Sequence, residues 1–188
     1  MGFIPANNSK IKTEKQESLF RQTYDKAPTP KRVFILKLAV FPDDWGGSFK
    51  ENLRVNDQGY VASLLEQGIN FKIMQSNTSV FTPGCHRFWH VHPEQNELLV
   101  TSRLMIVGLI DRRSDSPTYN VKSKIVLSAD KALYVPAGVT HGFLNPDTKN
   151  DSVLIYFTDK YFVPGDDTQE YRIDPKNLPF DFVKPEIM

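Results

Sequence analysis

Short apolar runs separated by turn-forming residues make up most of this chain after residue 30. The runs are rich in Val, Ile, Phe and Leu, and Pro, Gly, Asn and Asp stand between them. Runs of this length and spacing predict many short strands and little helix. The strands that we expect are 32–40, 48–53, 71–81, 85–92, 97–110, 119–127, 132–135, 141–145 and 153–162, with one helical segment at 61–67. The pattern therefore predicts an all-β sandwich or barrel.

The two ends of the chain differ from this pattern. Residues 1–30 are mostly polar, and residues 165–188 show no strong periodicity. We therefore expect an N-terminal arm or flexible tail over 1–30, a barrel over 31–164, and a C-terminal extension over 165–188 that packs on the barrel. A chain of 188 residues is long enough to form one domain with a sizeable core.

Charge and composition narrow the classes of partner. Lys and Arg number 23 against 22 Asp and Glu, with no basic stripe, so nucleic acid is not an expected partner. The single cysteine, Cys85, cannot form an internal disulfide, which fits the cytosol. We find no signal peptide, and the longest apolar run, 104–110, is too short to cross a bilayer. We expect a cytoplasmic protein that acts on a small molecule without a membrane partner.

The histidines carry the first candidate chemistry, because all four fall in two short segments. His90 and His92 are two residues apart on an expected strand, so their side chains point to the same side. Glu97 begins the next apolar run, and His141 follows a Pro-x-Gly turn. Three imidazoles and one carboxylate form a ligand set for Zn, Mn, Fe, Ni or Co. We predict one divalent transition metal ion at these four side chains.

The spacing of these residues resembles the two sequence motifs of the cupin superfamily. Gly84 opens the first motif, and Pro136 and Asn145 belong to the second, whereas Leu104 and Asp130 replace motif glycines. Because glycines serve the turns and the ligands are retained, these departures affect loop geometry more than chemistry. The resemblance implies a cupin double-stranded β-helix, or jelly roll, with an N-terminal arm and an irregular C-terminal tail. Cupins of this kind usually pair, so it also implies a homodimer.

Further segments carry a narrower resemblance that extends over most of residues 41–182. They are 47–51, 75–79, 111–119, 134–143, 153–161 and 174–175. Together they resemble dTDP-4-dehydrorhamnose 3,5-epimerase and related sugar-nucleotide cupins. The resemblance implies a carbohydrate epimerase or isomerase whose substrate is a nucleotide-linked keto-sugar. In that family, a Gln and an Asn on one strand and an Arg three residues before the catalytic His bind the substrate, so Gln75, Asn77 and Arg87 would take these roles.

The catalytic residues of that family carry over only in part. The epimerases use a His base at the position of His90, a Tyr acid on a late strand, and a Lys that this chain lacks. The Tyr position aligns with Ile155, which would leave Tyr156 on the opposite face of its strand. Conversely, a typical epimerase has lost the second His and the Glu, whereas this chain keeps His92 and Glu97. The chain thus resembles the epimerases in scaffold and the metal cupins in its centre.

Two roles for His90 exclude each other, because a base needs the nitrogen lone pair that a metal ligand has given away. His90 is therefore a catalytic base only if no metal is bound. With metal bound, the proton would pass through His86, which alternation places on the face of His90, through Tyr134, or through water. Our first hypothesis is a metal-binding epimerase or isomerase. The alternatives are a metal-dependent dioxygenase or lyase and a non-catalytic sugar-binding cupin.

Overall fold

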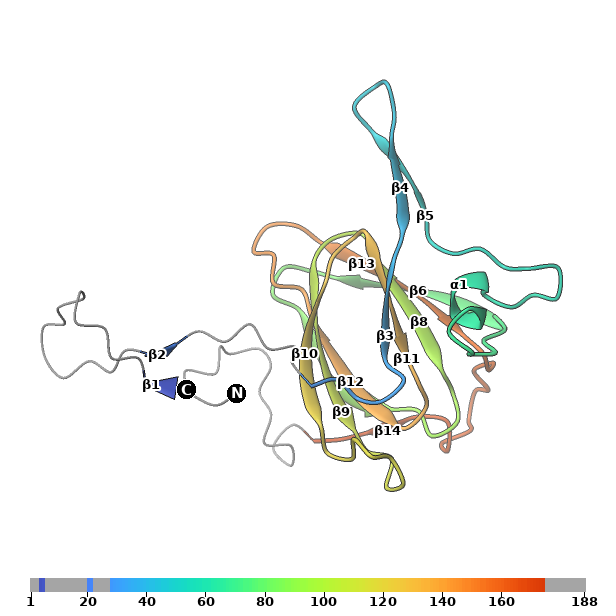
Figure 1. Ribbon diagram of the computed structural model, residues 1–188, viewed down its shortest axis with the longest axis vertical. Coiled ribbons are helices and arrows are strands. Elements are labelled where there is room, and N and C mark those ends of the chain that lie inside the picture. Colours follow the sequence, from blue (N-terminus) through green and yellow to red (C-terminus); the bar gives the residue numbers. More distant parts are fainter. Residues whose placement is uncertain (1–3, 6–19, 22–27, 175–188) are drawn as a thin grey trace, which may run out of the picture.

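The computed structural model describes residues 4–5, 20–21 and 28–174, and two facing five-stranded β-sheets form its body (Figure 1). One sheet has the order β10 (Lys122–Leu127), β9 (Met105–Asp111), β12 (Val139–Leu144), β7 (His86–Val91) and β14 (Tyr171–Arg172). The other has the order β3 (Phe34–Lys37), β11 (Lys131–Val135), β8 (Glu97–Thr101), β13 (Ser152–Thr158) and β6 (Gln75–Phe81). Antiparallel pairing in this non-sequential order is that of a jelly roll, so the predicted fold is confirmed.

Smaller elements surround the two sheets. Strands β1 (Ile4–Pro5) and β2 (Phe20–Arg21) pair with each other, as do β4 (Ala39–Pro42) and β5 (Ser48–Glu51). The short helix α1 (Ala62–Leu65) falls within the helical segment expected from the sequence. The described part of the chain contains no helix with the length and apolarity needed to cross a membrane.

The expected strand 97–110 is in fact two strands, β8 and β9, which lie in different sheets. The chain turns at residues 102–104, where the Thr101 hydroxyl donates to the Arg103 carbonyl (2.7 Å) and the Ser102 hydroxyl accepts from the Val153 N–H (2.8 Å). Leu104 ends this turn at the position of a cupin-motif glycine. Its φ is not positive, since Arg32 and Asn120 are the described non-glycine residues with positive φ. The turn therefore does not need glycine.

Apolar side chains fill the space between the sheets and cover one outer face. Leu99 of β8 belongs to the core between the sheets, whereas its neighbours Leu98 and Val100 face outward. There they pack under the segment of α1, where Leu64 and Phe71 are fully buried. Because both faces of β8 are covered, every residue of the strand is buried. The packing on both sides holds the inward face of β8 rigidly against the core.

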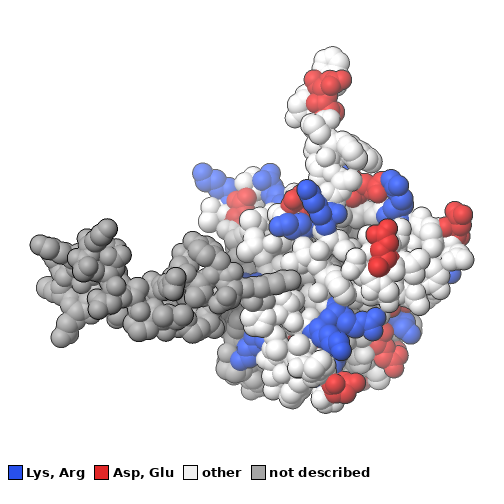
Figure 2. Space-filling view, in the orientation of Figure 1, with Lys and Arg blue, Asp and Glu red and all other residues white. Residues whose placement is uncertain are grey.

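The β4–β5 hairpin projects away from the barrel (Figure 1). Lys50 at its base donates hydrogen bonds to the carbonyls of Thr101 (3.0 Å) and Ala129 (3.1 Å). Phe41 and Phe49 stack across the hairpin yet are largely exposed, and Trp45 near the tip is 97% exposed. In Figure 2 the hairpin carries a group of acidic side chains near its tip, whereas acidic and basic side chains are interspersed on the visible face of the barrel.

Candidate active site and metal centre

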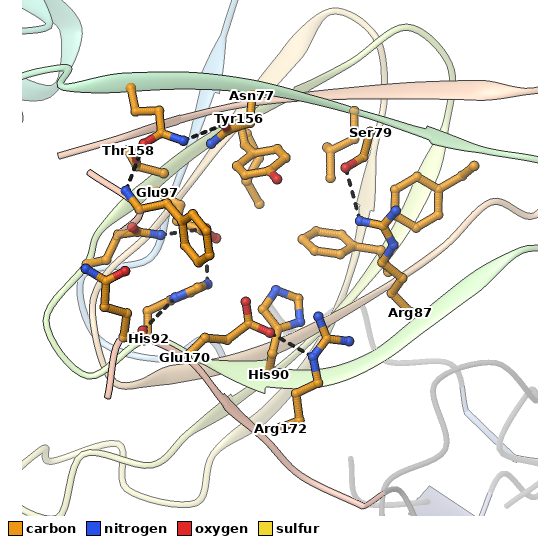
Figure 3. Close-up of a pocket in the computed structure, with 18 residues that line it drawn as sticks. Asn77, Ser79, Arg87, His90, His92, Glu97, Tyr156, Thr158, Glu170 and Arg172 are labelled. Carbon is orange, nitrogen blue, oxygen red and sulfur yellow. Dashed lines mark hydrogen bonds and ion pairs between the residues drawn. The ribbon is translucent and has the colours of Figure 1, made fainter. Parts of the chain in front are cut away.

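A cavity of about 310 Å³ lies between the two sheets (Figure 3). Strands β6, β8 and β13 of one sheet and β7, β12 and the segment around β14 of the other supply its walls. Four buried apolar side chains, Phe81, Leu99, Phe143 and Leu154, line part of it. Amide, hydroxyl and charged side chains line the rest. A cavity in which several polar groups converge beside an apolar wall is a candidate site for a polar small molecule.

The four predicted metal ligands come together in this structure. His90 in β7 is the register partner of His141 in β12, and His92 follows directly after β7. Glu97 begins β8 and reaches them from the facing sheet. One donor atom from each of the four side chains lies within 4.8 Å of all the others. Three imidazoles from one sheet thus face one carboxylate from the other.

Short contacts show how the cluster is arranged. Oε2 of Glu97 lies 2.9 Å from Nε2 of His141, and Oε1 lies 3.4 Å from Nε2 of His92. The rings of His90 and His141 are 4.1 Å apart between centroids. His92, Glu97 and His141 are 9%, 3% and 1% exposed, so three of the four ligands are almost shielded from solvent. The side-chain amide of Gln95 supports the carboxylate by donating to its Oε1 (3.2 Å).

Main-chain carbonyls orient two of the imidazoles. Nδ1 of His141 donates to the Val139 carbonyl (3.0 Å), and Nδ1 of His92 donates to the Gln169 carbonyl (3.1 Å). Each ring therefore directs Nε2 toward the cluster, where the neutral form of the imidazole has its lone pair. Nε2 of His141 is buried and makes no aligned hydrogen bond. Metal-ligating histidines are commonly held in this manner by a carbonyl behind the ring.

The Pro-x-Gly turn before His141 has a structural cause. Gly138 has φ +78°, and an added Cβ would lie 2.5 Å from Cγ of Arg113, so a larger residue would not fit. The Gly138 N–H donates to the carbonyl of His92 (2.8 Å), which ties the turn to the end of β7. This bond fixes the start of β12 beside β7, and it thereby helps to set His141 opposite His90.

Within the cluster, Glu97 and His141 favour each other's charged forms, whereas His90 is held neutral. Burial opposes the ionisation of Glu97, but the adjacent His141, together with His92 and His90, outweighs it and lowers the pKa of Glu97 to about 2. Burial likewise disfavours the charged form of His141, yet the Glu97 carboxylate raises the pKa of His141 above its ordinary value. Burial and the charge of His141 hold the pKa of His90 well below its ordinary value, so His90 is neutral near pH 7. A neutral imidazole has a nitrogen lone pair for a metal ion or a proton.

These residues fit a divalent transition metal ion. Ligand atoms about 2.1 Å from a common ion are at most about 4.2 Å apart, so a cluster within 4.8 Å needs only a small contraction. The donor set is the N and O set that such ions accept. Nε2 of His141, whose 2.9 Å contact with Glu97 is not an aligned hydrogen bond, would also gain a well-directed partner.

The predicted substrate-binding residues all line the same cavity. The side-chain amide of Gln75 donates to Oδ1 of Asn77 (2.7 Å), and its own oxygen accepts from the Phe162 N–H (2.8 Å). Arg87 donates to the Ser79 hydroxyl (3.0 Å), and its guanidinium lies 4.9 Å from the ring centre of Phe81. The cavity wall thus offers amide groups and a positioned cation to a polar ligand.

The expectation that His86 shares the face of His90 is wrong. His141 of β12 pairs with His90 of β7, and Phe143 pairs with Arg87. The two pairs are two residues apart along β12 but three residues apart along β7, so β7 contains one extra residue. This β-bulge shifts the alternation, so Arg87 and His90 both line the cavity. His86 is exposed instead, with its ring 4.3 Å from that of Phe88 between centroids.

Tyr156 was expected on the wrong face, and the structure corrects this. Tyr156 lines the cavity, whereas Ile155 packs in the cluster outside the second sheet. The phenol of Tyr156, and not the side chain of Ile155, is therefore available in the cavity. Tyr134, the other candidate for moving a proton, packs edge-on against Phe71 outside the cavity. Burial raises the pKa of Tyr134 to about 12, which suits a packing role.

Sequence reasoning did not find two charged residues of the site, Glu170 and Arg172. Both line the cavity from the segment that contains β14, and Nε of Arg172 donates to Oε1 of Glu170 (2.9 Å). Arg172 is the register partner of His90. No periodicity marks residues 165–174, and the pairing of two residues with β7 is too short to leave a pattern.

Comparisons with known proteins agree with this geometry. Two facing antiparallel sheets with ligand-bearing strands around a central cavity define the cupin-type class. The family model for dTDP-4-dehydrorhamnose 3,5-epimerase matches residues 30–186, so the chain belongs to that family. Its enzymes are carbohydrate epimerases, as the sequence resemblance implies. No curated protein sequence matches the chain.

Several solved structures share the fold. The dTDP-4-dehydrorhamnose 3,5-epimerase of Elizabethkingia anophelis is 25% identical, with a TM-score of 0.67 and 86% of each chain covered. A dTDP sugar isomerase of Desulfovibrio desulfuricans is 21% identical, with a TM-score of 0.66, covering 81% of this chain and 91% of its own. The dTDP-6-deoxy-D-glucose-3,5-epimerase of Legionella pneumophila, solved with dTDP-4-keto-L-rhamnose, is 22% identical (TM-score 0.64; 78% and 75% covered).

Proposed function

We propose that this protein epimerises a keto-sugar carried on a nucleoside diphosphate, with the help of one divalent transition metal ion. The observation that carries the proposal is the cluster of His90, His92, Glu97 and His141 on the wall of a cavity that also contains Tyr156. Family membership supports the sugar chemistry. The complete ligand set supports the metal, which a typical member of the family could not hold.

The substrate class follows from the cavity wall. Gln75 and Asn77 present amide groups that can bond hydroxyl and carbonyl groups of a sugar. Arg87 supplies a guanidinium, whose fork of donors suits diphosphate oxygens. The complex of the Legionella pneumophila relative with dTDP-4-keto-L-rhamnose supports a nucleotide-linked 4-keto sugar. These three residues bind the substrate and orient it toward the histidines.

The metal ion would be held by Nε2 of His92 and of His141, a ring nitrogen of His90 and the Glu97 carboxylate. When bound, it polarises the sugar carbonyl and stabilises the negative charge that develops on the carbonyl oxygen. The protein supports this centre through the carbonyls behind His92 and His141 and the amide of Gln95. The apolar part of the cavity limits water near the reacting carbon.

Tyr156 supplies a proton to the reacting carbon. Its side chain lines the cavity from β13, on the wall opposite His90 (Figure 3). Epimerisation requires that a proton leaves one face of the carbon and a proton arrives at the other. A phenol on one wall can serve one of these two faces.

The protein works in the cytoplasm as a homodimer, and the β4–β5 hairpin supports the dimer. Isolated exposed side chains are normal, but Phe41, Trp45 and Phe49 gather on one hairpin that reaches away from its own barrel. A second copy of the chain would bury them. Because the interface repeats by symmetry, each hairpin would contact the other protomer.

Two measurements on the purified protein test the proposed function. Wild-type protein is expected to contain about one equivalent of a transition metal by elemental analysis. It is also expected to incorporate deuterium from D₂O into a dTDP-linked 4-keto-6-deoxy sugar, followed by NMR. His92→Ala removes one ligand, so we expect loss of the metal and of the exchange. His86→Ala, which alters an exposed histidine outside the cavity, is the matched control and should retain both.

Three other results of these measurements would replace the proposed metal-dependent epimerase with a different function. Protein that cannot be loaded with metal but still exchanges sugar protons would leave His90 as the base and remove the metal from the proposal. Protein that binds iron and consumes oxygen would favour the dioxygenase, because the same four ligands can support oxygen chemistry. Protein that binds the nucleotide sugar without exchange would be a binding cupin.

A further inference from the structure

Glu170 places a carboxylate in the cavity, on the wall opposite Tyr156 (Figure 3). It is not one of the four clustered donors. It nevertheless lies close enough to them for its negative charge to contribute to the raised pKa of His141. Glu170 therefore lies beside the centre at which the sugar carbonyl would be polarised, without being a ligand.

The position of Glu170 is fixed by neighbours on both sides. The preceding residue, Gln169, accepts the His92 hydrogen bond at its carbonyl, and its side chain bonds the Val163 N–H (2.9 Å) and the Tyr161 carbonyl (3.1 Å). On the other side, Arg172 pairs with β7 as the partner of His90. The carboxylate is thus positioned before a substrate arrives, which a catalytic group needs.

The ion pair with Arg172 leaves part of the carboxylate available. Oε1 of Glu170 accepts from Nε of Arg172 at 2.9 Å. The other oxygen, Oε2, has no hydrogen-bond partner among the described residues, and the carboxylate points into the cavity in Figure 3. One oxygen therefore holds the side chain in place, while the other can accept a proton.

We propose that Glu170 is the base that removes the proton from the carbon next to the sugar carbonyl, with Tyr156 as the acid on the opposite face. This inference rests on the proposed function. His90 cannot serve as the base once its lone pair binds the metal ion. Tyr156 on β13 and Glu170 before β14 belong to opposite walls of one cavity, so a sugar ring between them presents one face to each.

The step conserves atoms and charge. Oε2 of Glu170 forms a bond to the hydrogen as the C–H bond breaks, and the electron pair of that bond forms a C=C bond. The carbonyl π electrons move to oxygen and give an enolate. The enolate then reforms the C=O bond, and its carbon takes the proton of the Tyr156 hydroxyl from the other face. The carboxylic acid and the phenolate that remain return to their first states by exchanging a proton with water.

Glu170→Gln is the main test, because glutamine keeps the shape and can still accept from Arg172. In D₂O with the dTDP-linked 4-keto-6-deoxy sugar, we expect exchange and epimerisation to fall by about 10²–10⁴-fold. The metal content and the affinity for dTDP should stay unchanged. Glu94→Gln, the same chemical change at an exposed residue outside the cavity, should leave every readout unchanged.

Tyr156→Phe tests proton delivery to one face of the reacting carbon separately from proton removal at the other face. This variant should still exchange deuterium at the reacting carbon, because Glu170 can remove and return the proton on its own face, but it should form little epimer. A structural defect would lower both signals together, so retained exchange with lost epimerisation supports the two-wall arrangement. Equal loss of exchange in Tyr156→Phe and Glu170→Gln would overturn it.

The outcomes distinguish this inference from the proposed function. Normal exchange by Glu170→Gln would show that another group is the base, and the epimerase function would survive. Loss of metal from Glu170→Gln would assign Glu170 to the support of the metal centre and overturn its role as base. Wild-type protein without any exchange would overturn the proposed function and the role of Glu170 with it.

Discussion

Asp111, at the end of β9, is the centre of a compact hydrogen-bond network. Its carboxylate accepts from the Arg113 guanidinium (2.7 and 2.8 Å), the Ser116 hydroxyl (2.7 Å) and the Thr118 hydroxyl (2.6 Å). The segment 111–119 resembled the epimerase family in sequence, and the structure now gives those residues a local reason. The network folds the loop between β9 and β10 against the turn at Gly138, where Arg113 packs.

Replacing Asp111 should destabilise the protein in a way that depends on pH. Burial opposes ionisation, but hydrogen bonds from Arg113, Thr118 and Ser116 outweigh it and hold the pKa of Asp111 far below its ordinary value. We expect Asp111→Asn to lower the free energy of unfolding by about 2 kcal/mol at pH 7, a modest figure because Arg113 is partly exposed to screening solvent. Asp115→Asn, at an exposed position in the same loop, should change it little.

The sign of the pH dependence follows from the lowered pKa of Asp111. Above about pH 4, the ordinary pKa of Asp, both the folded and the unfolded chain carry the charge, so the full stabilisation is present. Below that pH the unfolded chain binds a proton first, and the stabilisation declines as the pH falls toward the lowered pKa. Denaturant titrations from pH 7 to pH 2 should show wild type and Asp111→Asn converging below pH 4. A constant difference would contradict the assignment.

The sequence predicted which side chains come together where their spacing is tied to ligand chemistry. His90, His92, Glu97 and His141 were found because a metal site requires several ligands at strand-compatible intervals. Side-chain direction was less predictable, because alternation cannot foresee a bulge. The bulge in β7 displaced His86 from the cavity. Glu170 had no motif to reveal it, since only the fold brings it near the histidines.

Among the secondary-structure elements, most strands of the two sheets overlap segments expected from the sequence, whereas β14 and the connections between strands were not predicted. The expected strand 97–110 conceals the turn between β8 and β9, because Thr101 and Ser102 close that turn with side-chain hydrogen bonds rather than with glycine or proline. Position 104 nevertheless held a clue, since the cupin motif has a turn glycine there. The assignment of strands to sheets depends on long-range pairing, which apolar periodicity does not encode.

The β4–β5 hairpin gives a prediction about association. If two protomers bury their hairpins, Trp45→Ser combined with Phe49→Ser should shift the protein from dimer to monomer in sedimentation velocity. Loss of a buried aromatic residue at an interface typically costs about 2 kcal/mol or more. Val126→Ser, at a half-exposed position on β10, is the control for a surface change of similar chemistry. An unchanged sedimentation coefficient in the double variant would exclude the hairpin from the interface.

For the whole molecule, the metal centre should act as a link between the two sheets. Three ligands come from one sheet and Glu97 from the other, so an ion binds the folded arrangement and not the unfolded chain. At an ion concentration 100 times Kd, the stabilisation is about 2.7 kcal/mol. For a chain of this size we expect Tm to rise by roughly 5–10 °C.

Differential scanning calorimetry of chelator-treated protein, before and after metal addition, measures this shift. The shift should vanish in His92→Ala and persist in His86→Ala. An equal shift in all three proteins would indicate that the ion binds elsewhere.

The segment from Asp159 to Ile173 makes the cavity wall and the proposed base depend on each other. It is attached at one end through Asp159 to Asn96 and at the other through Ile173 to Trp89, and between them it borders the cavity. Because it also carries Glu170, a substitution that loosened either attachment would displace the carboxylate together with the wall. Substrate binding and proton removal would then decline together, although no residue that contacts the sugar had been changed.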